Sequence, residues 1–272
     1  MLPVSSISDL PIILLAQVSG QVFHPDVKNA DVWVPMLLRW LHFLAGIVWI
    51  GHLYFFNLVN VNLMKSLDGP TKGKVIPQLM PRALWWFRWG ALVTVLVGLM
   101  YYAMYILAPD INNAKALGGV NANVGIVLLV WFVIPEVTFG RVMACVKSIN
   151  NGWTLAIVIG IITSAMSVVI IYWLNKSMSS SIGSYASNKS LSIGIGGALG
   201  AIMLFNVWGI IWPNQKRIIS WTADNAEKGT AIPAESAKLA RISFLASRMN
   251  TWLSIPMLFF MAASTHYPIL GK

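Results

Sequence analysis

The stretch LHFLAGIVWIGH, residues 41–52, carries two histidines inside a longer apolar run over residues 34–59. A bilayer core about 30 Å thick is crossed by a helix of about 20 apolar residues, because each residue adds ~1.5 Å. The run is therefore long enough to cross a membrane. Its two histidines are separated by ten residues, so they would lie at depths that differ by ~15 Å.

Five further stretches have the length and apolar character of a membrane span. They cover residues 84–107, 122–139, 153–174, 191–212 and 251–269. The second and the last of these are each interrupted by proline or a polar residue. The pattern predicts an all-α fold: a polytopic integral membrane helical bundle of about six transmembrane helices.

The composition excludes a water-soluble fold. The chain has 272 residues, of which 57% are hydrophobic and 10% are charged, whereas soluble domains carry roughly 25% charged residues. The net charge is +10, but the basic residues fall in short loops between the apolar runs. This placement indicates a lipid bilayer and not nucleic acid as the partner. Several of the 13 tryptophans lie at segment ends, as in the aromatic belt of membrane proteins.

Lysine and arginine are distributed unequally between the two sides of the predicted bundle. The loops after the first, third and fifth helices hold 13 of the 19 basic residues. Because cytoplasmic loops are enriched in these residues, both termini are predicted outside. In a bacterium this means a multi-pass protein of the inner (cytoplasmic) membrane with periplasmic termini.

Two domains follow from this organisation. Residues 1–33 contain an apolar stretch too short to span a bilayer, and we interpret them as a periplasmic or interfacial strap that includes His24. Residues 34–272 form the six-helix transmembrane domain. Its largest cytoplasmic loop covers residues 213–250, with a surface helix expected in the alanine-rich part, 231–246.

The single cysteine, Cys145, excludes an internal disulfide. It also excludes a c-type haem attachment and any cluster or zinc site held by several cysteines of this chain. Chemistry must therefore come from other side chains.

Histidine is the first candidate, because an ionisable residue inside a membrane predicts function. A neutral imidazole is a good axial ligand for haem iron. His42 is predicted as a haem b ligand, with Gly46 one turn away leaving room for the macrocycle. His266, on the antiparallel sixth helix, should lie within ~5 Å of the same depth, and His52 is the other candidate partner. The alternatives stay open: Gly46 can serve helix packing, and His266 can meet lipid headgroups.

Glu136 is a carboxylate within the third predicted helix. Such a group must be paired or protonated. Arg88 and Arg141 are the candidate partners for a buried ion pair, and a proton relay is the alternative.

Three pairs of sequence elements resemble a known family. They are LRWLH (38–42) with WIG (49–51), NVW (206–208) with WPNQK (212–216), and NTWLSIP (250–256) with HYP (266–268). Over residues 34–269 the chain is similar to the membrane (N-terminal) domain of the bacterial cytochrome-c-linked urate oxidases. The resemblance implies a polytopic domain coupled to respiratory electron transfer.

Members of that family carry a fused C-terminal cytochrome c domain, which we expect this chain to lack. His42 and His266 match the family pattern. The family also has a histidine where this sequence has Gly194, and the position of His52 is usually not histidine.

Three functions are consistent with the sequence. The leading hypothesis is an integral membrane subunit of a respiratory-type electron-transfer complex that binds haem b and meets other membrane subunits or a c-type cytochrome. The second is a cofactor-free scaffold subunit. The third is a urate-oxidase-like membrane oxidoreductase, whose carboxylate–histidine or lysine site the sequence alone does not assemble. Whether the chain is itself an enzyme stays open, with an oxidoreductase within a complex as the catalytic option.

Overall fold

The computed structural model describes residues 30–149, 151–180, 183–184 and 186–271. Within these residues the chain forms six long helical runs, three of them built from an α-helix, a π-helical turn and a second α-helix. Most of the predicted strap, including His24, lies outside the described residues. The first composite run consists of α2 (Ala30–Tyr54), η3 (Phe55–Asn60) and α3 (Val61–Ser66). The second consists of α4 (Gly69–Tyr102), η4 (Ala103–Leu107) and α5 (Ala108–Ala116). The third consists of α8 (Asn188–Asn206), η5 (Val207–Ile211) and α9 (Trp212–Lys228). The single helices are α6 (Val124–Ser148), α7 (Gly152–Ser177) and α10 (Glu235–His266), and a small hairpin pairs β1 (Ser179–Ser180) with β2 (Gly183–Ser184).

The all-α prediction is confirmed, and the chain has the helices of a membrane protein. Among the described residues, five helical runs are long and apolar enough to cross a bilayer: those of α2, α4, α6, α7 and α8. The sixth predicted span lies in α10, whose first half is the polar stretch 235–250.

Short polar residues set where several helices begin. The side chain of Asn123 accepts hydrogen bonds from the first backbone N–H groups of α6, and Asn151 does the same for α7. Asp68 and Ser187 cap α4 and α8 in the same manner. Each side chain satisfies N–H groups that a helix start leaves without a partner.

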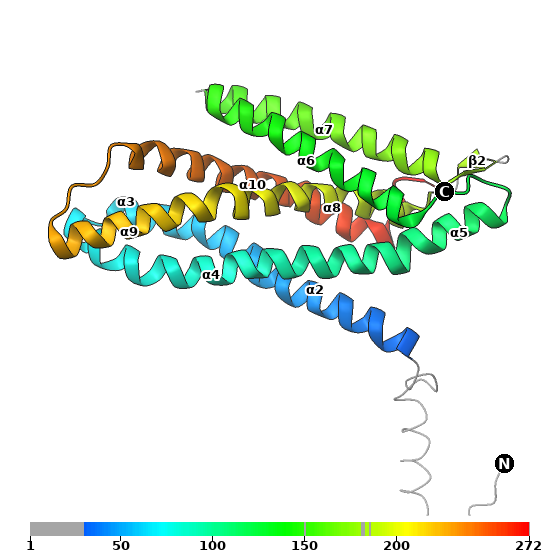
Figure 1. Cartoon of the computed structure of the whole chain (residues 1–272), viewed down its shortest axis with the longest axis horizontal. Helices are drawn as coiled ribbons and strands as arrows, with labels where there is room; N and C mark the ends of the chain where they lie inside the picture. Colours follow the sequence, from blue (N-terminus) through cyan, green and yellow to red (C-terminus); the bar gives the residue numbers. More distant parts are fainter. Residues whose placement is uncertain (1–29, 150, 181–182, 185, 272) are drawn as a thin grey trace, which may run out of the picture.

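The helices form layers that run nearly parallel to one long axis (Figure 1). α6 and α7 pack side by side on one face, α8 and α10 form the middle, and α4 with α2 lies on the other side. We call the end with α3 and α9 the α9 end. The opposite end, where α5, the start of α8 and the end of α10 meet, is the α5 end.

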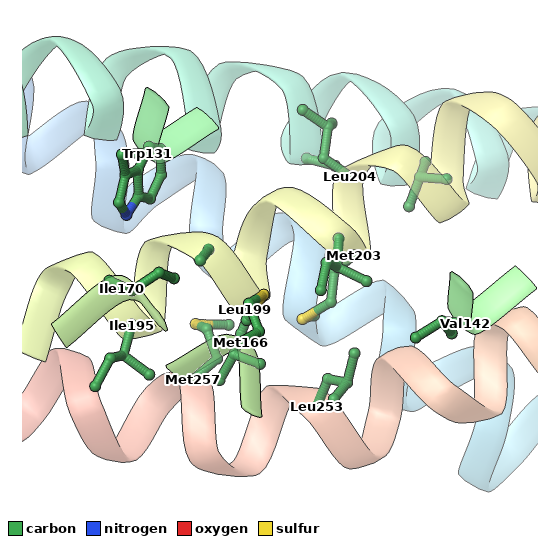
Figure 2. Packing of buried hydrophobic residues seen from close by; sticks show 14 of the residues in the cluster. Trp131, Val142, Met166, Ile170, Ile195, Leu199, Met203, Leu204, Leu253 and Met257 are labelled. Atoms are coloured by element: carbon green, nitrogen blue, oxygen red, sulfur yellow. The ribbon is translucent and has the colours of Figure 1, made fainter. Parts of the chain in front are cut away.

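α8 is the centre of the hydrophobic core. Its Ile195, Leu199 and Met203 meet side chains of α7 and α10, including Ile170 and Met257 (Figure 2). Gly196 allows the close approach of α10, because a Cβ at this position would lie 3.2 Å from the backbone oxygen of Met257. Small residues thus let α8 pack against neighbours on all sides.

The helices are longer than the apolar runs predicted. The predicted cytoplasmic loop 213–250 is helical for most of its length: α9 continues from the fifth run to Lys228, and α10 begins at Glu235. An ion pair between Arg217 of α9 and Glu235 of α10 joins the two extensions. Hydropathy marks only the apolar part of a helix, whereas these polar extensions are held by packing of α9 on α4 and α10.

Candidate functional site

His42 directs its ring from α2 toward α4. Its Nδ1 donates a hydrogen bond to the backbone oxygen of Thr94, at 2.9 Å. A carbonyl oxygen can only accept, so Nδ1 carries the proton in the neutral ring and Nε2 keeps its lone pair. Gly98 makes room for the ring, because a Cβ there would lie 2.7 Å from Cε1 and Nδ1 of His42. The imidazole is therefore held against a neighbouring helix through Nδ1.

His52 has a similar tautomer but a different support. Its Nδ1 donates to the backbone oxygen of Val48, at 2.7 Å, one turn earlier in its own helix. The ring also lies 6.4 Å from that of Phe56, centroid to centroid. His52 is thus held within α2, whereas His42 is bound across the interface of two helices.

His266 is exposed at the last position of α10. α2 and α10 meet where the Tyr54 hydroxyl lies 3.0 Å from that of Ser254. His42 and His266 are each twelve residues from this contact, so they lie at about the same level of the bundle. At that level α2 packs on α4 and α10 packs on α8, and no ring contact joins the two histidines in the described part of the chain.

The glycines near the predicted cofactor site have different surroundings. A Cβ on Gly46 would meet Thr94 at 3.7 Å, which is ordinary packing distance. Gly194 is tightly enclosed, since a Cβ there would lie 2.7 Å from Leu174 and 2.9 Å from the Tyr102 hydroxyl. Trp131 also donates to the Gly194 oxygen at 2.9 Å. Side chains of this protein therefore fill the space around Gly194, the position at which the resemblance implies a further histidine.

Arg88 lies in a cage of tryptophan rings. Its guanidinium carbon is 3.7 Å from the ring centre of Trp212, 5.7 Å from that of Trp208 and 6.0 Å from that of Trp89. The indole N–H of Trp208 also donates to the Arg88 backbone oxygen at 3.1 Å. Cation–π attraction of this kind stabilises an arginine within apolar surroundings.

Glu136 and Arg141 are both exposed on α6. No ion pair links Glu136 with Arg88 or Arg141 among the residues that the structure describes. Within one chain Glu136 therefore meets neither candidate partner: Arg88 contacts aromatic rings, and Glu136 and Arg141 face outward.

A cavity of about 500 Å³ lies at the α5 end. Asp110 is fixed at its edge, because its Oδ2 accepts hydrogen bonds from the Ser187 N–H at 2.9 Å and from the Ser190 hydroxyl at 2.6 Å. Lys189 is exposed beside it in the first turn of α8. The lining residues are Tyr105, Ile106, Pro109, Asp110, Ser187, Asn188, Lys189, Ser264, Thr265 and Pro268.

The family described as "Urate oxidase N-terminal" matches residues 68–272, which is most of the chain. The chain belongs to this family. No curated protein and no solved structure is similar enough to give a match.

The family match confirms the resemblance, and it covers α4 to α10 with the cavity at the α5 end. It begins at Asp68, so α2 with His42, Gly46 and His52 precedes it. Within the described residues, no group of three or more histidine, cysteine, aspartate or glutamate side chains is placed to hold a metal ion.

Two of the sequence elements that carry the resemblance meet in the core. Asn206 donates from Nδ2 to the side-chain oxygen of Asn250 at 2.7 Å, and Asn250 donates to the Met203 oxygen at 3.0 Å. Both asparagines are fully buried. They join α8 to α10 within the apolar interior, where such bonds fix the register of the two helices.

Asn188 is a structural residue that the sequence did not single out. Its Nδ2 donates to the backbone oxygens of Ala263 and Ser264, and its Oδ1 accepts from the N–H groups of Ile269 and Leu270. It thereby holds the end of α10 beside the cavity. The sequence signal that could have identified it is an asparagine in the first turn of an apolar helix, because a polar side chain that becomes buried must be hydrogen-bonded.

Proposed function

We propose that this member of the urate oxidase N-terminal family is an integral membrane subunit of an electron-transfer assembly that holds haem b through His42. The observation that carries the proposal is the tautomer of His42. In a histidine that binds a metal through one ring nitrogen, the other ring nitrogen commonly donates a hydrogen bond to a carbonyl oxygen. This bond fixes the orientation of the ring and raises the basicity of the ligand. The bond from Nδ1 to Thr94 is of this type.

The surroundings of His42 also fit a macrocycle. The ring is half-buried on the α2–α4 interface, while the neighbouring Leu41, Phe43 and Leu44 are exposed apolar side chains. Haem, when bound, supplies a one-electron carrier whose potential depends on its axial ligands and burial. His42 would supply one axial ligand, and His266 and His52 are the candidates for the other.

The membrane placement belongs to the same proposal. α10 would cross as a sixth span, with both termini on the outer side of a bacterial inner membrane and the α9 end in the cytoplasm. The basic residues of the α9 end support this orientation, since cytoplasmic segments near membrane spans carry the excess of lysine and arginine. A c-type cytochrome or another membrane subunit would then exchange electrons at the α5 end.

The reduced-minus-oxidised spectrum of the purified chain tests the proposal. We expect a b-type α band and Soret band that are lost in His42→Ala. Helix content measured by circular dichroism should stay unchanged, because the half-buried ring contributes little to the core. His52→Ala and His266→Ala are the matched controls: each should retain the band, with a shift only in the variant that removes the second ligand. A colourless wild-type protein that co-purifies with a stoichiometric complex would instead indicate a scaffold subunit.

A second function, oxidation of urate or a related small molecule, is favoured by the cavity at the α5 end. The structure places there a carboxylate, Asp110, and a lysine, Lys189, that the sequence could not bring together. A positive charge at the start of a helix is suited to an anionic ligand. Oxidation would release electrons to a c-type cytochrome at the same end.

Urate-dependent reduction of added cytochrome c by the membrane-embedded chain tests this function. Lys189→Gln should lower kcat/KM about tenfold, the size expected when a charged hydrogen bond is removed. Lys176→Gln, at another exposed lysine of the same end, should leave the rate unchanged. Reduction that does not depend on urate, or equal effects of the two variants, would exclude the cavity as the substrate site.

A further inference from the structure

Glu136 occupies an unfavourable place for a carboxylate. α6 spans Val124–Ser148, so Glu136 is twelve residues from either end, or ~18 Å along the helix. It is exposed on the bundle surface, where its surroundings would be hydrocarbon. A charge at this depth is rare unless it pairs with another group.

The surface around Glu136 has the pattern of a helix–helix contact. α6 packs into the bundle through one side, which includes Trp131, Pro135 and Val142. A second row lies on the opposite side, with spacings that alternate between four and three residues. Its members are Ile126, Val130, Val133, Val137, Gly140 and Ala144. This alternation is typical of the heptad repeat along which two helices pack at a small angle. We call this row of residues the seam.

Gly140 and Ala144 bring two backbones close together at this seam. A Cβ on Gly140 would have no neighbour within 4 Å, so the fold of one chain does not require glycine there. Small residues four positions apart are typical of close contacts between membrane helices. Val137, one turn before Gly140, is 58% exposed and completes the apolar part of the seam.

The charges beside the seam determine which partner helix can bind there. Glu136 directly precedes the seam residue Val137, and Arg141 directly follows the seam residue Gly140. On a single helix these two side chains are ~140° apart and point to opposite sides of the seam. Between two parallel helices, a separation of five residues is the spacing at which side chains flanking the seam form interhelical ion pairs.

We propose that α6 is the interface of a symmetric homodimer in which Glu136 of each copy pairs with Arg141 of the other. Two copies inserted in the same orientation are related by an axis along the membrane normal, so the same surface serves both. Each carboxylate then gains a cation, and both seams are removed from lipid. The inference is independent of haem binding.

α7 provides a comparison within the same layer. Its exposed side includes Ile157, Ile161 and Val168 and also a glycine, Gly160, whose Cβ would have no neighbour within 4 Å. No charged residue lies between Gly152 and Tyr172. α7 therefore has the character of an ordinary lipid-facing helix, and it is the matched control for α6.

The oligomeric state of the full chain in lipid vesicles, measured by single-molecule photobleaching over a dilution series, tests the proposal. We expect wild type to be dimeric and Gly140→Ile to be monomeric, with unchanged helix content. Gly160→Ile should stay dimeric. Glu136→Gln keeps the seam but removes both ion pairs of the dimer, and it should weaken dimerisation about tenfold, since two polar contacts of average size between membrane helices are lost.

A charge exchange identifies the partner. Glu136→Arg and Arg141→Glu should each abolish the dimer, and the double variant should restore it, because the ion pairs form again with reversed sign. In a Cys145→Ser background, Val137→Cys should cross-link under oxidation and Ile161→Cys should not. A monomeric wild type, a dimer lost in Gly160→Ile but not in Gly140→Ile, or a double variant without rescue would overturn the proposal. Recovery of a different membrane protein on this surface would also overturn it.

Discussion

α8 and α2 are both long apolar helices, but they hold opposite positions in the molecule. In the run that contains α8, 67% of the most apolar 18-residue window is buried, whereas the corresponding value for the run of α2 is 6%. The two sequences are similar in hydropathy, at 1.8 and 1.5. Hydropathy therefore identifies both as spans without showing which one forms the core.

The small residues of α8 explain its central position. Gly194 and Gly196 allow α4, α7 and α10 to approach closely, and Ser190 and Ser192 are fully buried among them. α2 packs mainly on one neighbour, α4, and leaves apolar side chains such as Phe43 and Ile47 exposed. α8 therefore provides stability, while the candidate ligand His42 lies on a helix whose surface is open to lipid, a cofactor or another subunit.

The largest effect is expected from overpacking α8. Gly194→Leu would place a side chain where Leu174 and Tyr102 already lie, and Tyr102 is held by its hydrogen bond to the Ser190 oxygen. We expect destabilisation by about 3 kcal/mol or more, seen as loss of monodisperse protein and a lower melting temperature in detergent. Gly200→Ala is the control, because its Cβ would have no neighbour within 4 Å. Equal melting temperatures for wild type and Gly194→Leu would contradict the assignment of α8 as the core.

A smaller effect on stability, but a large effect on the proposed haem binding, is expected at the α2–α4 interface. Gly98→Val would displace the His42 ring from its place against α4. We expect loss of the b-type Soret band with a change in the free energy of unfolding below about 1 kcal/mol. Gly46→Ala, which adds only ordinary contact with Thr94, should keep the band. A band that survives Gly98→Val would show that the bond to Thr94 does not position the ligand.

Most of the architecture followed from the sequence because apolar length is a strong signal. All six predicted runs are helical over most of their length, and their order is correct. The helix ends were underestimated: α4 begins at Gly69 and not near Leu84, because polar residues such as Lys72 and Lys74 continue a helix that packs on α9. Contacts of this kind leave no apolar signature in the sequence.

The relative depths of the two candidate ligands could be predicted from the sequence, but the helices beside each of them could not. The spacing of His42 and His266 from the ends of their helices gave nearly equal levels, which the Tyr54–Ser254 contact supports. Which helices pack together depends on side-chain fit, so the proximity of His42 to Gly98 did not follow from the sequence. Arg88 shows the same limit: a carboxylate was the expected partner, and three tryptophans surround it instead.

The smallest effect is expected outside both helices, at the cap between α3 and α4. The Thr71 N–H donates to the Asp68 side chain. A hydrogen bond from the Thr71 side chain is the main cause that lowers the pKa of the Asp68 carboxyl, and the bond from the backbone N–H adds to it. Because the pKa is lowered in the folded state, the cap stabilises the protein at neutral pH. Its contribution is lost as the pH falls below about 4, through the lowered pKa of the folded state.

Asp68→Ala should therefore lower the melting temperature by about 1–2 °C at pH 7, and the difference from wild type should disappear in acid. Asp68→Asn separates capping from charge, since asparagine accepts the same hydrogen bond without titrating. This variant should melt like wild type at pH 7 and keep its advantage over Asp68→Ala in acid. A difference between wild type and Asp68→Ala that persists in acid would mean that the carboxylate does not cap α4, and the start of this helix would then depend on Pro70 and on packing against α9.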